Sequence, residues 1–120
     1  LRARGARIFT LDEIRRANAE GINALFTSAL GRAAEGARAL MVSFDMDAAC
    51  SADAPGVSAP SPVGFSANEI LSFAFLAGAE RQTRLVDIVE CNPRFDADGR
   101  TAKLAALIAA QACRGVLACA

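Results

Sequence analysis

Residues 40–47 read LMVSFDMD, an apolar run with β-branched and aromatic side chains that stops at two aspartates one residue apart. Such a run predicts a buried parallel strand, whose carboxyl end lies at the edge of an open α/β sheet where ligands bind. Side chains alternate along a strand, so Asp45 and Asp47 share a face unless the chain turns between them. Two converging carboxylates with no lysine or histidine nearby repel each other, and a hard cation relieves that repulsion. The alternative is a strand that ends in a solvated Asp-x-Asp turn.

Strands and helices alternate along the chain. The pairs Thr10/Glu13 and Ser66/Glu69 match the capping box, in which each residue satisfies an exposed backbone donor at a helix start. The charged residues of the first helix, Arg15 among them, are expected on its solvated face. The predicted elements are strand 6–9, helix 11–34 with a bend or break at Gly21, strand 39–44, helix 67–79, strand 85–91, and helix 100–114 ended by Gly115. This order predicts an α/β fold of three layers, α/β/α, with a parallel sheet and right-handed crossovers.

A long connection, residues 46–65, leaves the strand end where the two aspartates lie, and it contains Pro55, Pro60 and Pro62. A loop of this length inside a compact domain is usually functional, so we expect it to form the wall of a pocket. The alternative is a rigid surface connection. The next strand also carries a carboxylate, Glu90, near its carboxyl end. Strands that point the same way bring Asp45, Asp47 and Glu90 to one edge of the sheet, which makes the three acids a candidate site.

The composition narrows the class of protein. The chain has 120 residues, zero formal net charge and 53% hydrophobic residues, so we expect one folded domain, or part of one, that does not bind nucleic acid. No uninterrupted apolar stretch reaches the roughly 18–20 residues of a membrane span and no secretory signal is visible, which predicts a cytoplasmic location and no membrane partner. The cysteines form no C-x-x-C pair, and we expect Cys113 and Cys119 to be small core residues with reduced thiols.

Four segments occur in the order in which a known superfamily has them. They are residues 43–48 (SFDMDA), 54–60 (APGVSAP), 64–69 and 89–93 (VECNP). Together they resemble the C-terminal half of the ureohydrolase superfamily, which comprises arginase, agmatinase and formimidoylglutamase, and the resemblance extends over about the whole chain. The second segment is most similar to the formimidoylglutamase branch, because arginases usually have threonine where Ala59 stands.

The resemblance implies a hydrolase of linear amidines that contains two manganese ions in an arginase-like fold. In that family the first aspartate of SFDMDA, here Asp45, bridges both ions, and the second, Asp47, binds one of them. The glutamate before Asn-Pro, here Glu90, faces the amidine or guanidinium group of the substrate. Formimidoylglutamate is the substrate that the resemblance favours most, followed by agmatine or arginine. The parent protein is expected to be a homo-oligomer. Oxygen ligands suit manganese, and two ions roughly 3.5–4 Å apart can hold and acidify a bridging water.

The chain departs from this family in one respect, because it contains no histidine. The remaining metal ligands of the family, a histidine and a D-x-H-x-D segment, belong to the N-terminal half, as does an acidic residue that handles protons. We therefore expect residues 1–120 to be the C-terminal fragment of a single ureohydrolase-type domain, in a hydrolase roughly twice this length or more. Alone, the fragment is expected to be inactive, to bind metal weakly, and to expose an edge or face of its sheet that favours association.

Two other classes of protein remain open. In a phosphatase of the haloacid-dehalogenase type, a hydrophobic strand also ends in D-x-D, with the first aspartate a nucleophile and the second a general acid. Such an enzyme needs a lysine and a later pair of acids on a strand end, whereas Lys103 lies in a predicted helix and Asp96 and Asp98 lie in a turn. The other class is a non-catalytic interaction domain, in which the acids only solubilise the sheet edge.

Overall fold

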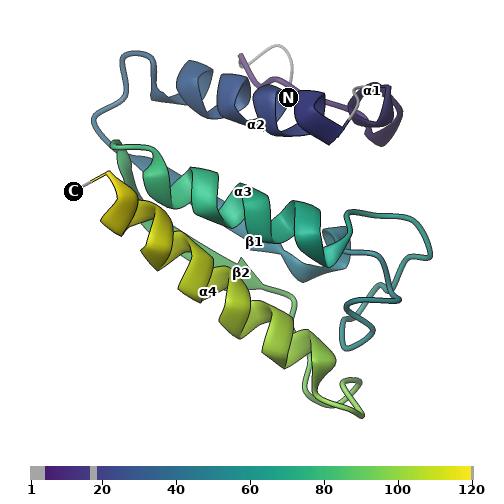
Figure 1. Cartoon of the computed structure of the whole chain (residues 1–120). Coiled ribbons are helices and arrows are strands. Elements are labelled where there is room, and N and C mark those ends of the chain that lie inside the picture. Colours follow the sequence, from purple (N-terminus) through teal and green to yellow (C-terminus); the bar gives the residue numbers. More distant parts are fainter. Residues whose placement is uncertain (1–4, 17–18, 120) are drawn as a thin grey trace.

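The computed structural model describes residues 5–16 and 19–119. Its elements, in chain order, are α1 (Leu11–Arg15), α2 (Ala19–Ala34), β1 (Leu40–Asp45), the 3-10 turn η2 (Met46–Ala48), α3 (Ala67–Ala79), β2 (Thr83–Val89) and α4 (Arg100–Ala118). Figure 1 shows α3 and α4 lying in front of the two strands, with α2 next to α3. The β1–α3–β2 segment is thus the centre of the molecule, and the other helices pack beside it.

The two strands form a parallel sheet. Leu40 pairs with Thr83 at one end of the sheet and Asp45 pairs with Val89 at the other, with one irregularity between Leu40 and Met41. Parallel neighbours need a crossover connection, which α3 supplies here. The structure therefore confirms the predicted α/β class and the parallel pairing.

The faces of this sheet differ in burial. Phe44 is part of the hydrophobic core, and Val42, Val86 and Ile88 pack against that core from the same face. On the opposite face, Met41 keeps 60% and Leu85 keeps 52% of their surface exposed. The described residues contribute one helical layer and one sheet layer, so the second helical layer of the predicted α/β/α arrangement does not come from them.

A close contact between α3 and α4 depends on two glycines. A Cβ atom placed on Gly78 would lie 1.9 Å from the carbonyl oxygen of Ala112, and one placed on Gly115 would lie 2.1 Å from that of Phe75. Gly115 was expected to end the last helix, and that expectation was wrong, because α4 continues to Ala118. Gly115 does not adopt the positive φ of a terminating glycine. It lets the two helix backbones approach each other.

Two expectations for the N-terminal part were also wrong. The helix expected over residues 11–34 is divided, because α1 ends at Arg15 and α2 begins at Ala19, ahead of Gly21. Residues 6–9 form no strand. Their backbone groups make no hydrogen bond with the backbone of any described residue. A strand requires a neighbour to satisfy its backbone groups, and the described part of the chain places none there.

The helix α4 buries one stripe of residues, namely Thr101, Leu104, Ile108, Ala112 and Gly115. Cys113 and Cys119 lie off this stripe and are exposed free thiols, so their predicted place in the core was wrong. The periodicity of a helix, rather than the apolar character of its residues, determines which of them reach the core. By length and composition alone α4 could also cross a membrane, a property that buried core helices share.

The first turn of α4 is capped by two carboxylates from the preceding turn. The Asp96 side chain accepts hydrogen bonds from the backbone N–H groups of Thr101 (3.0 Å) and Ala102 (2.9 Å), and the Asp98 side chain accepts one from Arg100 (3.1 Å). Asp98 also forms an ion pair with the Arg100 guanidinium at 2.6 Å. The N-cap residue itself, Gly99, has no side chain that could do this, so Asp96 takes over the capping role.

We predict that Asp96→Asn reduces the pH dependence of folding stability. Burial alone would raise the pKa of Asp96, but the hydrogen bonds from Ala102 and Thr101 outweigh it and hold the pKa below its ordinary value of 3.8. The stabilisation is therefore present above pH 3.8 and is lost as the pH falls through the lower folded-state pKa. Thermal unfolding between about pH 6 and pH 3 should show a lower Tm for the variant at the upper end and a smaller loss of Tm on acidification. Asp12→Asn, on exposed α1, is the control and should follow the unmodified chain.

Candidate active site

Two of the predicted site residues lie at adjacent strand ends. Asp45 is the last residue of β1, and its register partner is Val89, the last residue of β2. Glu90 follows Val89 directly, so no helix separates the two strand ends that carry Asp45 and Glu90. This edge of a parallel sheet is where open α/β folds bind their ligands.

The chain turns between the two aspartates. The 3-10 turn η2 begins immediately after Asp45, whose Oδ1 accepts a hydrogen bond from the backbone N–H of Asp47 at 2.9 Å. Oδ1 of Asp47 in turn accepts one from the N–H of Ala59 at 3.3 Å. Each carboxylate is thus held by one oxygen, and its second oxygen bonds no described residue. The Asp-x-Asp segment is a turn, and it still presents two oxygen atoms for a ligand.

These acids do not form a complete metal site within the described residues. No group of three histidine, cysteine, aspartate or glutamate side chains in that part of the chain is arranged to hold a metal ion. Asp45 and Glu90 are exposed and Asp47 is half-buried. Carboxylate oxygens are the kind of donor that manganese accepts, so the chemistry of Asp45 and Asp47 fits the ion. The number of donors falls short, and further ligands would have to come from outside these residues.

The backbone of Glu90 has an unusual conformation. Its φ angle is +63°, which no other non-glycine residue in the described part of the chain shares. A left-handed conformation costs free energy for a residue that has a Cβ atom, and such residues cluster at functional sites. The β2 strand ends at this point, so the unusual φ redirects the chain and the carboxylate at the sheet edge.

We predict different effects of two substitutions at Glu90. Glu90→Gly should raise the free energy of unfolding by about 1 kcal/mol, because glycine adopts a positive φ without strain. Glu90→Gln retains the Cβ atom and should leave stability unchanged. Urea unfolding of both variants measures the difference, and a Glu90→Gly chain less stable than Glu90→Gln would contradict backbone strain at this residue.

The long connection of residues 49–65 folds back on the aspartate turn. The N–H of Phe65 donates to the carbonyl of Ala48 at 2.9 Å, and the N–H of Cys50 donates to the carbonyl of Phe65 at 2.8 Å. Phe65 and Ala48 also line a cavity of about 210 Å³ together with Phe44 and Asp45. The loop therefore forms part of a cavity wall next to Asp45, as its position in the sequence predicted.

Gly56 attaches the middle of this loop to the rest of the site. Its N–H donates to the buried hydroxyl of Thr101 at 2.7 Å, and its carbonyl accepts from the N–H of Asn92 at 2.8 Å. A Cβ atom on Gly56 would lie 2.3 Å from Cβ of Asp96, so no larger residue fits. The loop is thereby held against both α4 and the turn that follows Glu90.

Arg15 was expected on a solvated helix face, and its side chain is exposed, but it also makes contacts that the sequence did not predict. Its guanidinium pairs with Glu69 at the start of α3, donates to the carbonyl of Gly64 at 2.5 Å, and lies 5.6 Å from the centre of the Phe65 ring. The hydrogen bond to Glu69 raises the pKa of Arg15 and lowers the pKa of Glu69. Arg15 thus links α1 to the base of the loop. Its partners are distant in the sequence, so no local pattern could have indicated this role.

We predict that Arg15→Ala loosens the base of the loop. The ion pair is partly exposed to solvent, so its loss should lower the free energy of unfolding by only about 1 kcal/mol. Hydrogen exchange of the Phe65 amide, which bonds Ala48, should accelerate more than exchange in the centre of α4. Arg16→Ala, which changes an exposed neighbour, is the control and should leave both quantities unchanged.

The residues that a phosphatase of the haloacid-dehalogenase type would need lie elsewhere. Lys103 is in α4, where its ammonium donates to the carbonyl of Asp98. Asp96 and Asp98 bind the first turn of the same helix. None of the three stands on a strand end beside Asp45.

Comparison with known proteins assigns the chain to a family. The Arginase family model matches residues 1–114. Formimidoylglutamase of Aromatoleum aromaticum is 43% identical over 67 residues, which cover 56% of this chain and 20% of that protein. Among solved structures, Trypanosoma cruzi formiminoglutamase with Mn²⁺ superposes with a TM-score of 0.85 at 30% identity, and Bacillus subtilis formimidoylglutamase with a TM-score of 0.90 at 25% identity. These matches cover 96% and 98% of this chain but 38% and 36% of the solved chains. The chain therefore belongs to the arginase family.

Proposed function

We propose that this chain supplies the aspartate-rich half of the active site of a manganese-dependent hydrolase of linear amidines. The observation that carries the proposal is the pairing of Asp45 with Val89, which places Asp45 and Glu90 on adjacent strand ends. The relatives and neighbours named formimidoylglutamase, and the T. cruzi structure with Mn²⁺, support this reaction class. Because the chain spans well under half of those proteins, the remaining ligands are expected from the part that it does not contain.

Each of the three acids has a role that its surroundings support. Asp45 and Asp47 would hold the metal through the carboxylate oxygens that bond no described residue, and the hydrogen bonds from Asp47 N–H and Ala59 N–H keep the two carboxylates in place. Manganese, when bound, would lower the pKa of a bound water so that it becomes a nucleophile at neutral pH. The Glu90 carboxylate accepts two hydrogen bonds from the cationic amidine of the substrate and orients its central carbon.

Formimidoylglutamate is the substrate that we propose first, followed by agmatine and arginine. The resemblance of the 54–60 loop and the names of the relatives favour this order. We further propose a cytoplasmic homo-oligomer that binds neither nucleic acid nor membrane, which is in keeping with zero formal net charge.

Manganese titration followed by electron paramagnetic resonance tests the proposed ligands. The isolated chain should bind Mn²⁺ more weakly than about 0.1 mM, because it offers few ligands. Asp45→Asn and Asp47→Asn should each abolish this binding, and Asp12→Asn should leave it intact. Submicromolar binding by the isolated chain, or binding that survives Asp45→Asn, contradicts the proposal. Hydrolysis of a phosphate ester that Asp45→Asn abolishes would favour the phosphatase instead.

A further inference from the structure

A polar side chain at the N-terminus of α4 is completely buried. Thr101 keeps 0% of its surface exposed, as does the apolar Ile108 two turns further along the same helix. The Thr101 hydroxyl accepts a hydrogen bond from the N–H of Gly56 at 2.7 Å, and the same side chain hydrogen-bonds the Asp96 carboxylate. A hydroxyl that both accepts and donates has a fixed orientation, so Thr101 is a rigid attachment point for the loop.

Gly56 has little room to move away from this attachment point. A Cβ atom on Gly56 would lie 2.3 Å from Cβ and 2.8 Å from Cα of Asp96. Asp96 is itself fixed to α4, because its side chain accepts hydrogen bonds from the N–H groups of Thr101 and Ala102. Gly56 therefore lies between the Thr101 hydroxyl and Asp96. In such a closely packed contact, a shift of one group displaces its neighbour.

One connection runs from Gly56 to the chain that follows Glu90. The carbonyl of Gly56 accepts a hydrogen bond from the N–H of Asn92 at 2.8 Å. Asn92 comes two residues after Glu90, and its side-chain oxygen accepts a hydrogen bond from the N–H of Arg94 at 3.1 Å. The turn after Glu90 is thus held by the loop as well as by its own side chain. The direction in which the chain leaves Glu90, and with it the place of that carboxylate, depends on Gly56.

A second connection runs from Gly56 along the loop to Asp47. Val57 follows Gly56 directly and is 1% exposed, so its side chain fixes the loop in the core. Ala59 comes two residues later, and its N–H donates to Oδ1 of Asp47 at 3.3 Å. A displacement of Gly56 is therefore passed on to the N–H that holds Asp47. Asp47 and Glu90 follow different strands, yet both are held through the same glycine.

We propose that Thr101 is a positioning residue of the candidate active site, which sets the places of Asp47 and Glu90 relative to each other through Gly56. Thr101 is buried and acts through the loop, so it contacts neither metal nor substrate. The inference rests on the proposed function, in which Asp47 binds manganese and Glu90 pairs with the amidine. Binding groups have to be held within roughly 0.5 Å of their productive geometry, which is why a rigid attachment of the loop matters.

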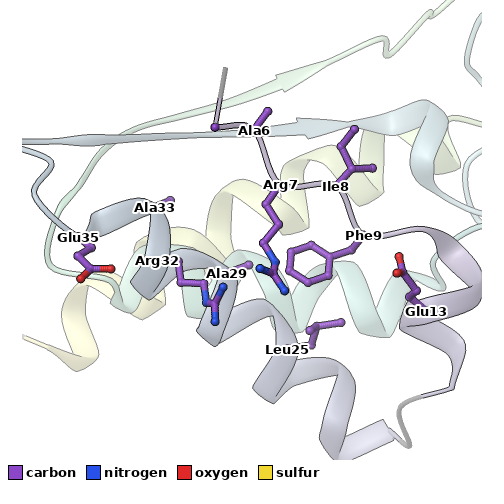
Figure 2. A pocket seen from close by; sticks show the side chains of 11 residues that line it. Ala6, Arg7, Ile8, Phe9, Glu13, Leu25, Ala29, Arg32, Ala33 and Glu35 are labelled. Carbon is purple, nitrogen blue, oxygen red and sulfur yellow. The ribbon is translucent and has the colours of Figure 1, made fainter. Parts of the chain in front are cut away.

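The control variant lies in a part of the molecule that is remote from these connections. A cavity of about 1250 Å³ lies between residues 5–9 and α2, and its lining, shown in Figure 2, includes none of Gly56, Asp47 and Glu90. Ala29, in the middle of α2, belongs to this lining. Ala29→Gly should lower the Tm, chiefly through helix propensity, and leave the hydrogen bonds of Gly56 unchanged.

The first test is amide hydrogen exchange of the isolated chain, which requires no metal. Thr101→Val removes the hydroxyl and should accelerate exchange at Ala59 and Asn92 about tenfold or more, because both N–H groups bond partners that Gly56 keeps in place. Thr101→Ser retains the hydroxyl and should restore most of the protection. Ala29→Gly should leave both amides as they are in the unmodified chain. Thr101→Ala, which also lacks the hydroxyl but favours the helix, gives the same readout if Thr101→Val does not fold.

The second test is Mn²⁺ titration followed by electron paramagnetic resonance. Thr101→Val should weaken the binding of Mn²⁺ about threefold or more, because Asp47 loses its fixed place. Thr101→Ser should bind as the unmodified chain does, and so should Ala29→Gly. A purely structural role of Thr101 predicts instead that Thr101→Val and Ala29→Gly change the affinity equally at an equal loss of Tm.

Three results would overturn the inference. The first is unchanged exchange at Ala59 and Asn92 in Thr101→Val, and the second is an equal acceleration in Ala29→Gly. The third is a Thr101→Val chain that binds Mn²⁺ as tightly as the unmodified chain. If the unmodified chain binds no Mn²⁺ while Thr101→Val still accelerates the two amides, the proposed function fails, and the placement of the two acids by Thr101 stands.

Discussion

Replacing Gly115 by alanine is expected to lower the free energy of unfolding by about 3 kcal/mol, although alanine is the better helix former. The new Cβ atom would lie 2.1 Å from the carbonyl oxygen of Phe75 and 2.7 Å from the backbone nitrogen of Ala79. Both atoms belong to the backbone of α3, which cannot move aside as a flexible side chain could. The two helices must therefore separate, and the core between them opens. Urea unfolding followed by far-UV circular dichroism measures the loss.

Gly31→Ala provides the control with the opposite sign. Gly31 is an exposed residue of α2, and a Cβ atom placed there meets nothing within 4 Å. The same substitution should therefore raise the free energy of unfolding by about 0.5–1 kcal/mol, through helix propensity alone. Equal effects at the two positions would contradict a close contact between α3 and α4.

Gly56→Ala is expected to have the second large effect. Its Cβ atom would lie 2.3 Å from Cβ of Asp96 and 2.8 Å from its Cα, in a buried position. Accommodation of this atom should cost about 2–3 kcal/mol and displace the loop from α4 and from Asn92. We expect a lower Tm and a shift of the Asn92 amide resonance, because Asn92 donates to the carbonyl of Gly56.

Two substitutions at Thr101 separate the steric effect from the hydrogen bond. Thr101→Val removes the hydroxyl that accepts from Gly56 N–H and should cost about 1–3 kcal/mol, because a buried donor loses its partner. Thr101→Ser retains the hydroxyl and should cost less. If Thr101→Val and Thr101→Ser prove equally stable, the hydrogen bond does not anchor the loop.

Much of the architecture could be predicted because it depends on short-range patterns. Both capping boxes form as predicted, and α3 spans the predicted residues 67–79. The apolar runs before Asp45 and Glu90 form the two parallel strands. Alternating burial and helix caps are local in sequence, so one chain suffices to recognise them.

The errors, and the features that the sequence did not predict, arise mostly where distant residues determine the outcome. Gly115 would be a helix terminator in isolation, but the backbone of α3 makes it a contact residue inside a helix. The ion pair of Arg15 depends on Glu69, which is 54 positions away. The positive φ of Glu90 also has no sequence signature, because glutamate is not a residue that favours it.

Because Asp45, Asp47 and Glu90 all belong to one β1–α3–β2 unit, their spacing is fixed by a single uninterrupted stretch of polypeptide. A cut, a fusion or a gene rearrangement upstream of β1 would leave that spacing unchanged. Such a unit could be transferred between proteins as one segment, and the relative positions of its three acids would be retained.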